Sequence, residues 1–261
     1  MKRIISLLLV YVLCAQSGYA QVFLYGPGGP HTALKAAAEH FTEKTGIAVT
    51  VTAGPQATWE QEAKTKASII FGASDQSTVA ILRTHAARFD VNQVMPLYLR
   101  DAILLVRKGN PKKFKNLSDF INRDGKVIVN DGAGASNTSG TGVWEDILGR
   151  MGSVEKMARF RKNILAFTPN SGTSRKIFET NPEVDGWITW IDWAISNPDL
   201  GDVVLIEPSY VISRSMNIAV AKDANEDTKK FAEFLQSPEA EPFFKKFGWY
   251  KVKKQKRFLF F

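Results

Sequence analysis

Cysteine is almost absent from this sequence of 261 residues, and its one copy, Cys14, lies near the N-terminus. The rest of the chain therefore cannot use disulfides, thiolate metal ligands or a cysteine nucleophile. Histidine is scarce too. The three histidines, His31, His40 and His85, are scattered along the chain and do not have the spacing of metal ligands. A GxSxG elbow, an HExxH motif and a Walker-type glycine–lysine loop are all missing. We therefore expect neither an enzyme nor a cofactor; a hydrolase or phosphotransferase would need an activated nucleophile that the sequence does not show.

Long hydrophobic runs are missing as well. The apolar run at 4–15 has 12 residues, whereas a membrane-spanning helix needs about 20. This run follows Lys2 and Arg3 and precedes small residues at positions 18 and 20, which is the pattern of a secretory signal peptide. We expect residues 1–20 to be such a peptide and the protein to be exported to the periplasm or displayed at the cell surface.

A large excess of one charge is missing from the body of the chain. The formal net charge is +8, yet residues 21–250 carry 27 basic and 26 acidic side chains. Five further basic residues lie in the tail at 251–261. A near-neutral body offers no basic stripe for a polyphosphate, so nucleic acid is not an expected partner. The tail is either a solvated terminus or a contact for an anionic membrane or partner.

What the body does contain is a repeated alternation of strand, turn and helix. Short apolar, β-branched segments are followed by turns rich in glycine and by segments with helical periodicity. Consecutive units of this kind build parallel sheets with crossover helices. The predicted strands are 22–25, 47–52, 68–71, 126–130, 164–168 and 187–190.

Two long apolar stretches, 97–108 and 210–221, interrupt this alternation and are too apolar to be surface linkers. We expect them to be extended crossovers that join two lobes and act as a hinge. Lobe 1 then comprises residues 21–98 and 211–250, and lobe 2 comprises residues 99–210. The predicted fold class is α/β, with two lobes and two crossover strands.

The strand-to-helix turns are the parts of this fold that can bind a ligand. In a parallel sheet they lie at the carboxyl edge, where each following helix directs its unpaired N–H groups and positive dipole end. Glycine, hydroxyl and amide groups in such turns form an anion site, which we expect in a cleft between the lobes. The candidate ligand-binding residues are Gly28, Gly29, His31, Thr32, Ser74 and Asp75 in lobe 1, and Ser136, Thr138, Ser139, Gly140, Thr141, Ser171, Thr173 and Arg175 in lobe 2.

Several of these residues have an ordinary structural alternative. A single Ser or Thr before a helix is more often an N-cap, but residues 135–142 carry five hydroxyl or amide side chains, more than one cap can use. Arg175 is either a fork for a carboxylate or phosphate or an exposed helix charge. His31 is either an anion donor or a surface residue. Asp75 is unfavourable beside an anion unless it meets a ligand hydroxyl.

Five motifs resemble a known family. They are LYGPGGPHTAL at 24–34, GPQATW at 54–59, FGASDQ at 71–76, SNTSGTGVWED at 136–146 and WITWIDW at 187–193. They resemble the accessory colonisation factor C and major antigenic peptide family of type 2 periplasmic binding proteins, which is similar to molybdate- and sulfate-binding proteins. The resemblance extends from about Val22 to Trp249.

This resemblance implies a two-lobed type 2 periplasmic binding fold, a homodimer and a cleft for a small carboxylate or phosphate metabolite such as citrate or phosphoglycerate. The family's Thr-Ser-Gly-Thr loop corresponds to residues 138–141, and its first turn to residues 28–32. A family member has lysine where this chain has Ala135, which leaves Arg175 as the main candidate cation.

The expected function is therefore that of an exported solute-binding protein, with an ABC transporter permease as a further partner and a role in host colonisation. The alternative is a surface adhesin or virulence interaction protein in which the cleft is vestigial. An exposed apolar patch outside the cleft, and binding to host cells that survives mutation of Thr138 and Arg175, would favour this alternative.

Overall fold

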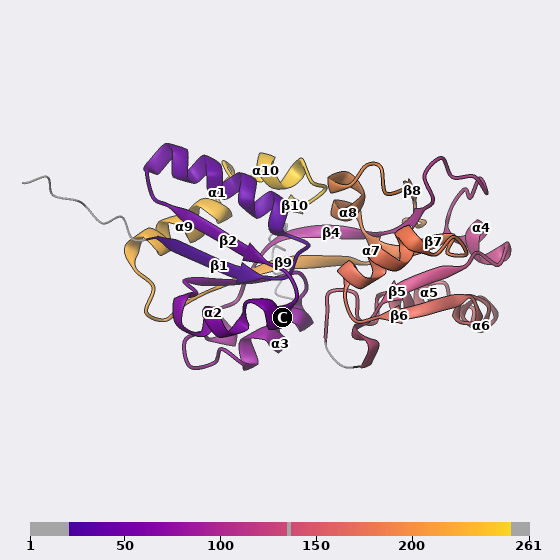
Figure 1. The fold of residues 1–261 in the computed structure, drawn as a ribbon, viewed down its shortest axis with the longest axis horizontal. Helices are drawn as coiled ribbons and strands as arrows, with labels where there is room; N and C mark the ends of the chain where they lie inside the picture. Colours follow the sequence, from indigo (N-terminus) through magenta and orange to yellow (C-terminus); the bar gives the residue numbers. More distant parts are fainter. Residues whose placement is uncertain (1–20, 135–136, 252–261) are drawn as a thin grey trace, which may run out of the picture.

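The computed structural model describes residues 21–134 and 137–251. Two α/β lobes lie next to each other along the long axis of the molecule (Figure 1). The predicted signal peptide, the basic tail beyond residue 251 and Ser136 fall outside the described residues. Among the residues described, no helix has both the length and the apolar character that crossing a membrane requires.

One continuous sheet of ten strands runs through the described part of both lobes. The strand order is β2-β1-β3-β9-β4-β7-β5-β6, and β8 and β10 also pair with β4. The predicted strand–turn–helix units are parallel, because β1 pairs in parallel with β2 and β3, and β5 with β6 and β7. The strands are β1 (Val22–Gly26), β2 (Val49–Ala53), β3 (Ile69–Gly72), β4 (Met95–Val106), β5 (Val127–Asn130), β6 (Ile164–Thr168), β7 (Gly186–Trp190), β8 (Asp202–Val204), β9 (Ser213–Val220) and β10 (Tyr250–Lys251).

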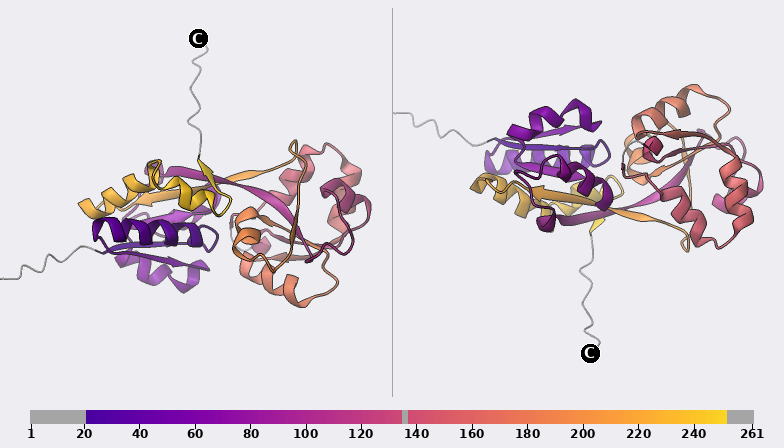
Figure 2. Two further views of the ribbon diagram at one scale, coloured as in Figure 1. Left: turned by 90° about the horizontal axis from the view of Figure 1, so that it is seen from above. Right: turned by 90° about the horizontal axis from the view of Figure 1, so that it is seen from below.

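Strands β4 and β9 connect the lobes, as the views from above and below show (Figure 2). Residues 95–101 of β4 pair with β9, and residues 102–106 pair with β7 of the second lobe. Both partners are antiparallel to β4, which the unit-by-unit sequence pattern did not reveal. Because β4 passes from one lobe into the other without a break, the expected limits of the lobes stay a prediction.

Helices cover both faces of the sheet in each lobe. In lobe 1, one core lies beneath α1, α9 and α10, and another beneath α2 and α3. Lobe 2 has two corresponding cores on the two faces of β4, β5 and β7. The helices are α1 (His31–Thr45), α2 (Glu60–Lys66), α3 (Asp75–Arg83), α4 (Leu117–Asn122), α5 (Val143–Arg150), α6 (Val154–Lys162), α7 (Ser171–Thr180), α8 (Ile191–Ser196), α9 (Glu226–Gln236) and α10 (Glu241–Lys245), with 3-10 turns at Gln56–Thr58, Val91–Gln93 and Gly132–Gly134.

Local chemistry sets where these helices begin and end. Helix α1 buries Ala and Leu side chains at helical spacing and ends at Gly46, whose φ of 74° is the left-handed conformation that glycine adopts freely. Helix α7 begins at Ser171, because the Asn170 side chain accepts a hydrogen bond from the backbone N–H of Thr173 at 2.9 Å. The candidate residues Ser171 and Thr173 therefore lie in the first turn of this helix.

Candidate functional site

A buried arginine lies on β4 where the two lobes meet. The side chain of Arg100 is only 1% exposed, and its Nη1 donates to both carboxylate oxygens of Asp192, at 2.7 and 2.6 Å. The guanidinium carbon lies 4.8 Å from the ring centre of Trp190 and 4.6 Å from that of Trp249. Two aromatic rings and one carboxylate therefore fix this cation in place.

Burial dominates the electrostatics of this ion pair. Removal from water lowers the pKa of Arg100, and the nearby Asp192 carboxylate opposes this effect. Burial likewise raises the pKa of Asp192, although Arg100 and the backbone N–H of Trp193 stabilise its charged form. Either charge left alone at this depth would be strongly destabilising, so the two groups depend on each other.

Both lobes bring a group to the Arg100 guanidinium. From lobe 1, Gly29 approaches so closely that a Cβ at this position would lie 2.4 Å from Nη1 of Arg100. From lobe 2, the Ser139 hydroxyl accepts a hydrogen bond from Nη2 of Arg100 at 3.3 Å. The turn before α1 and the loop before α5 therefore meet at one buried cation.

Hydrogen bonds within the loop before α5 determine its shape. The Thr138 hydroxyl donates to the side-chain oxygen of Asn130 at 3.2 Å and accepts from the backbone N–H of Gly140 at 3.2 Å. The Thr141 hydroxyl accepts from the backbone N–H of Thr138 at 2.9 Å. Gly140 packs on β5, since a Cβ there would lie 2.1 Å from the Asn130 carbonyl oxygen. The two threonine hydroxyls thus build the loop, while Ser139 contacts Arg100.

Gln76 links the lobes directly. Its side-chain amide, in the first turn of α3, donates to the backbone oxygen of Thr141 at 2.9 Å and lies 3.5 Å from that of Thr138. The residues before it are used within lobe 1. Ser74 caps α3 by accepting from the backbone N–H of Ser77, and Asp75 accepts from the Ser215 hydroxyl at 2.7 Å.

The remaining candidates of lobe 1 lie around the start of α1. No atom lies within 4 Å of the position that a Cβ would take at Gly28, and Thr32 is exposed. His31 is half-buried, and this burial, with Lys35 nearby, lowers the pKa of its imidazole. His31 is therefore neutral near pH 7 and can offer one N–H to an anion but no charge.

The candidates that follow β6 separate into two groups. The Ser171 hydroxyl accepts from the Asn130 side chain at 3.0 Å, and the Thr173 backbone N–H is satisfied by the helix cap. Arg175 instead pairs with Glu179 one turn further along α7, at 2.9 Å, and lines an outer hollow together with Arg107. The structure does not bring Arg175 to the Arg100 guanidinium; its local contact is that of an exposed helix charge.

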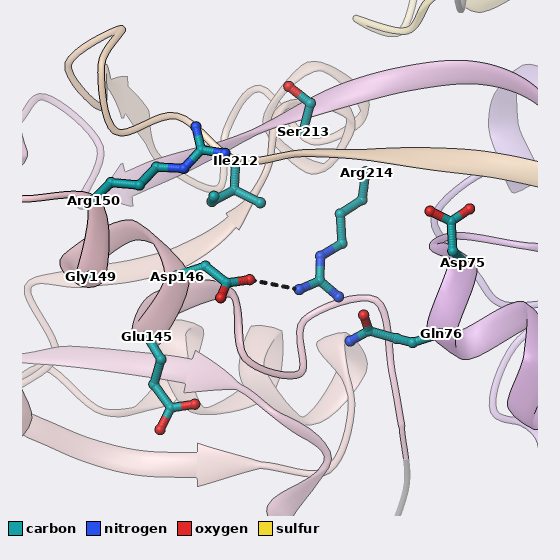
Figure 3. A pocket seen from close by; sticks show the side chains of 9 residues that line it. All are labelled: Asp75, Gln76, Glu145, Asp146, Gly149, Arg150, Ile212, Ser213 and Arg214. Carbon is teal, nitrogen blue, oxygen red and sulfur yellow. Dashed lines mark hydrogen bonds and ion pairs between the residues drawn. The ribbon is translucent and has the colours of Figure 1, made fainter.

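A second arginine, which sequence reasoning also missed, lies directly opposite the first. In the β4–β9 ladder Arg100 pairs with Arg214, so the two side chains leave the same face of the hinge strands. Arg214 points between Asp146 of α5 and Gln76 of α3 (Figure 3), into a hollow of about 670 Å³ that we call the Arg214 hollow. The available signal was an arginine inside each of the two predicted crossover stretches, although the first stretch also carries Asp101, Arg107 and Lys108. The hollow is lined by Asp75, Gln76, Glu145, Asp146, Gly149, Arg150, Ile212, Ser213 and Arg214.

Replacing Gln76 by alanine should loosen the contact between the lobes. The lost bond contributes on the order of 1 kcal/mol, so the population of open molecules without ligand should rise about fivefold. Small-angle X-ray scattering would then give a larger radius of gyration than for the wild-type protein. The matched control is Gln93→Ala, since Gln93 is exposed on the surface of lobe 1. An unchanged radius of gyration in Gln76→Ala would contradict a role for this side chain in closure.

Residues 22–250 match a family model described as bacterial extracellular solute-binding protein. The chain belongs to this family. Two solved structures share about half of its residues. The L-phospholactate-bound PEB3 structure is 51% identical with a TM-score of 0.86, and Peb3 from Campylobacter jejuni is 50% identical with a TM-score of 0.84; each match covers 88% of this chain and 100% of the other. No curated protein sequence matched.

More distant structures of solute-binding proteins share the fold. The periplasmic molybdate-binding protein of Azotobacter vinelandii is 14% identical with a TM-score of 0.64, over 89% of this chain and 100% of that one. The predicted type 2 periplasmic binding fold is thus confirmed, as is the resemblance to the major antigenic peptide family and to molybdate-binding proteins. Across the described residues, no group of three or more His, Cys, Asp or Glu side chains could hold a metal ion.

Proposed function

We propose that this solute-binding protein captures a small organic anion between its lobes and performs no chemistry on it. The observation that carries the proposal is the Arg100 guanidinium, a buried cation to which one lobe brings Gly29 and the other brings Ser139. PEB3, which shares half of its residues with this chain, has been solved with L-phospholactate, a molecule that carries a carboxylate and a phosphate.

The geometry suits binding of an anion in several ways that add together. Helices α1, α3 and α5 begin where the lobes meet, and α7 begins beside the loop before α5, because its Ser171 and the Thr138 of that loop both bond to Asn130. Each N-terminus stabilises a nearby negative charge by about 0.3–2 kcal/mol. Micromolar affinity requires about 8 kcal/mol, which four helix ends would supply only if each contributed the top of that range. The Arg100 guanidinium supplies the additional charge-assisted hydrogen bonds.

Ser139 is positioned for binding and not for nucleophilic attack. A serine nucleophile needs a neighbouring base that removes its proton. The described side chain that contacts the Ser139 hydroxyl is the Arg100 guanidinium, which donates and cannot accept a proton. The hydroxyl is therefore an acceptor for Arg100 and can donate its own hydrogen to an anion.

The proposal extends to the setting in which the protein works. We expect it to act in the periplasm, to form a homodimer and to deliver its anion to an ABC permease, with a role in host colonisation. Citrate and phosphoglycerate are the ligands that the family resemblance favours. L-Phospholactate joins them because of the PEB3 complex.

A thermal-shift screen of the purified exported protein tests the proposal. The compounds are L-phospholactate, 3-phosphoglycerate, citrate, sulfate, molybdate and glucose. A ligand that binds only the folded state at 100 times its Kd adds about 2.7 kcal/mol of stability, so the cognate anion should raise the Tm by about 5–11 °C. If glucose alone shifts the Tm, the anion assignment is wrong.

A further inference from the structure

We propose that Arg214 is the residue that makes this site specific for ligands with two separated anionic groups. The inference rests on the proposed function, because it names the ligand class for the same interlobe site. One anionic group of the ligand binds at Arg100 and the helix N-termini. The second enters the Arg214 hollow and replaces Asp146 as the partner of Arg214.

The two arginines are neighbours, but their carboxylate partners differ in how easily a ligand can displace them. Residues directly opposite each other in a ladder have Cβ atoms about 4.5–5.5 Å apart, so two anionic groups on a three-carbon molecule can reach both guanidinium groups. The partner of Arg100, Asp192, is 4% exposed and cannot turn into water. The partner of Arg214, Asp146, is 56% exposed and lies on the opposite lobe. Asp146 can therefore leave at little cost.

Arg214 is also short of acceptors. Its side chain is 13% exposed, its Nη2 donates to Asp146 at 3.2 Å, and its Nη1 is buried without a hydrogen-bond partner among the described residues. A buried donor without an acceptor is costly, and that cost is recovered when a ligand oxygen supplies the bond. Burial lowers the pKa of Arg214, and Asp146 opposes this effect only in part.

The Arg214 hollow has room for this second group. Its volume of about 670 Å³ lies within the range of small-molecule sites. Gln76 and Arg150 also line it (Figure 3), but the Gln76 amide donates to the Thr141 backbone oxygen and Arg150 Nη1 donates to the Val211 carbonyl oxygen. The donor that the described residues leave for the second group is therefore Nη1 of Arg214. Asp75 and Glu145 also line the hollow, and their charges disfavour an anion that does not reach Arg214. The hollow should therefore bind an anionic group that contacts Arg214 directly more tightly than an anion that does not reach it.

Isothermal titration of the exported protein with two probes tests the inference. L-Phospholactate carries two anionic groups, and inorganic phosphate carries one. Arg214→Gln should weaken L-phospholactate binding by about 10- to 100-fold and phosphate binding by less than about threefold, whereas Asp146→Asn should tighten L-phospholactate binding severalfold. The matched control is Arg150→Gln, which removes another cation from the lining of the same hollow. Because Nη1 of Arg150 already donates to the Val211 carbonyl oxygen, this variant should change the affinity for either probe by less than about threefold.

Arg214→Lys serves as a second variant in case Arg214→Gln fails to fold. It keeps the charge on β9, should melt as the wild type does, and should retain part of the preference for L-phospholactate. An equal loss of affinity for both probes in Arg214→Gln, or no loss for L-phospholactate, would overturn the inference and leave the proposed function intact. If the wild-type protein binds neither these probes nor the other anions of the thermal-shift screen, the proposed function fails together with it.

Discussion

Replacing Arg100 by methionine should abolish anion binding and lower the free energy of unfolding by about 3–5 kcal/mol, because it leaves the buried Asp192 carboxylate without its counter-charge. Titration with L-phospholactate and equilibrium unfolding in urea measure the two effects. A lone buried carboxyl group has a raised pKa, which favours the folded state at low pH and disfavours it as the pH rises. The Arg100→Met variant should therefore be more stable at pH 5 than at pH 8.

The double variant Arg100→Met, Asp192→Leu separates stability from binding. Replacing both members of a buried ion pair by apolar side chains of similar size is often neutral or stabilising. We therefore expect the double variant to recover most of the lost stability and none of the binding. Full stability in the single variant would show that the pair does not hold the hinge together, and anion binding by the double variant would remove Arg100 from the site.

Changing Gly29 to alanine should weaken anion binding by about 10- to 100-fold, although it adds only one methyl group. Its Cβ would lie 2.4 Å from Nη1 and 2.9 Å from Nη2 of Arg100. The guanidinium cannot move aside, because Trp190 and Trp249 flank it and Asp192 holds it. Overpacking of this kind costs about 1–3 kcal/mol, which corresponds to the expected loss.

The neighbouring residue provides the control for this prediction. Gly28 precedes Gly29 in the same turn, and a Cβ there meets no atom within 4 Å. Gly28→Ala should therefore bind L-phospholactate within about threefold of the wild-type affinity. Equal effects of the two substitutions would show that the turn acts through backbone flexibility and that its contact with Arg100 is irrelevant.

The fold was predictable because it depends on short-range patterns. A strand of β-branched residues, a glycine-rich turn and an amphipathic helix are all visible within about 25 residues of sequence, and they indicated the parallel parts of both lobes. The two apolar crossover stretches indicated β4 and β9 in the same way. The antiparallel pairing of β4 with β9 was not visible, because β9 begins at Ser213, more than 100 residues after β4 ends at Val106.

The cations of the site show why its chemistry was harder to predict. Arg175 follows a polar turn and was therefore the expected anion fork, but Glu179 lies four residues later on the same helix face and pairs with it. The importance of Arg100 depends on Asp192, 92 residues away, and on its register opposite Arg214. Strand register is a tertiary property, so neither arginine could be assigned from its local sequence.

Gln76 and Asp75 illustrate the same difficulty on a smaller scale. The sequence analysis included Asp75 among the candidates with the reservation that an aspartate is unfavourable beside an anion, and in the structure its carboxylate is bonded to Ser215 and Asn217 of β9. The glutamine one residue later contacts the other lobe. Insertion of β9 between β3 and β4 decides which of the two side chains faces lobe 2, and helix periodicity alone contains no information about that strand.

A crystal structure of the exported protein with L-phospholactate tests the central claim most directly. We expect the ligand between the lobes, with an anionic oxygen about 2.7–3.2 Å from the Arg100 guanidinium and a second group in the Arg214 hollow. Ligand density confined to the outer surface of either lobe, with the surroundings of Arg100 unchanged, would contradict the claim that the two lobes hold an anion at this buried cation.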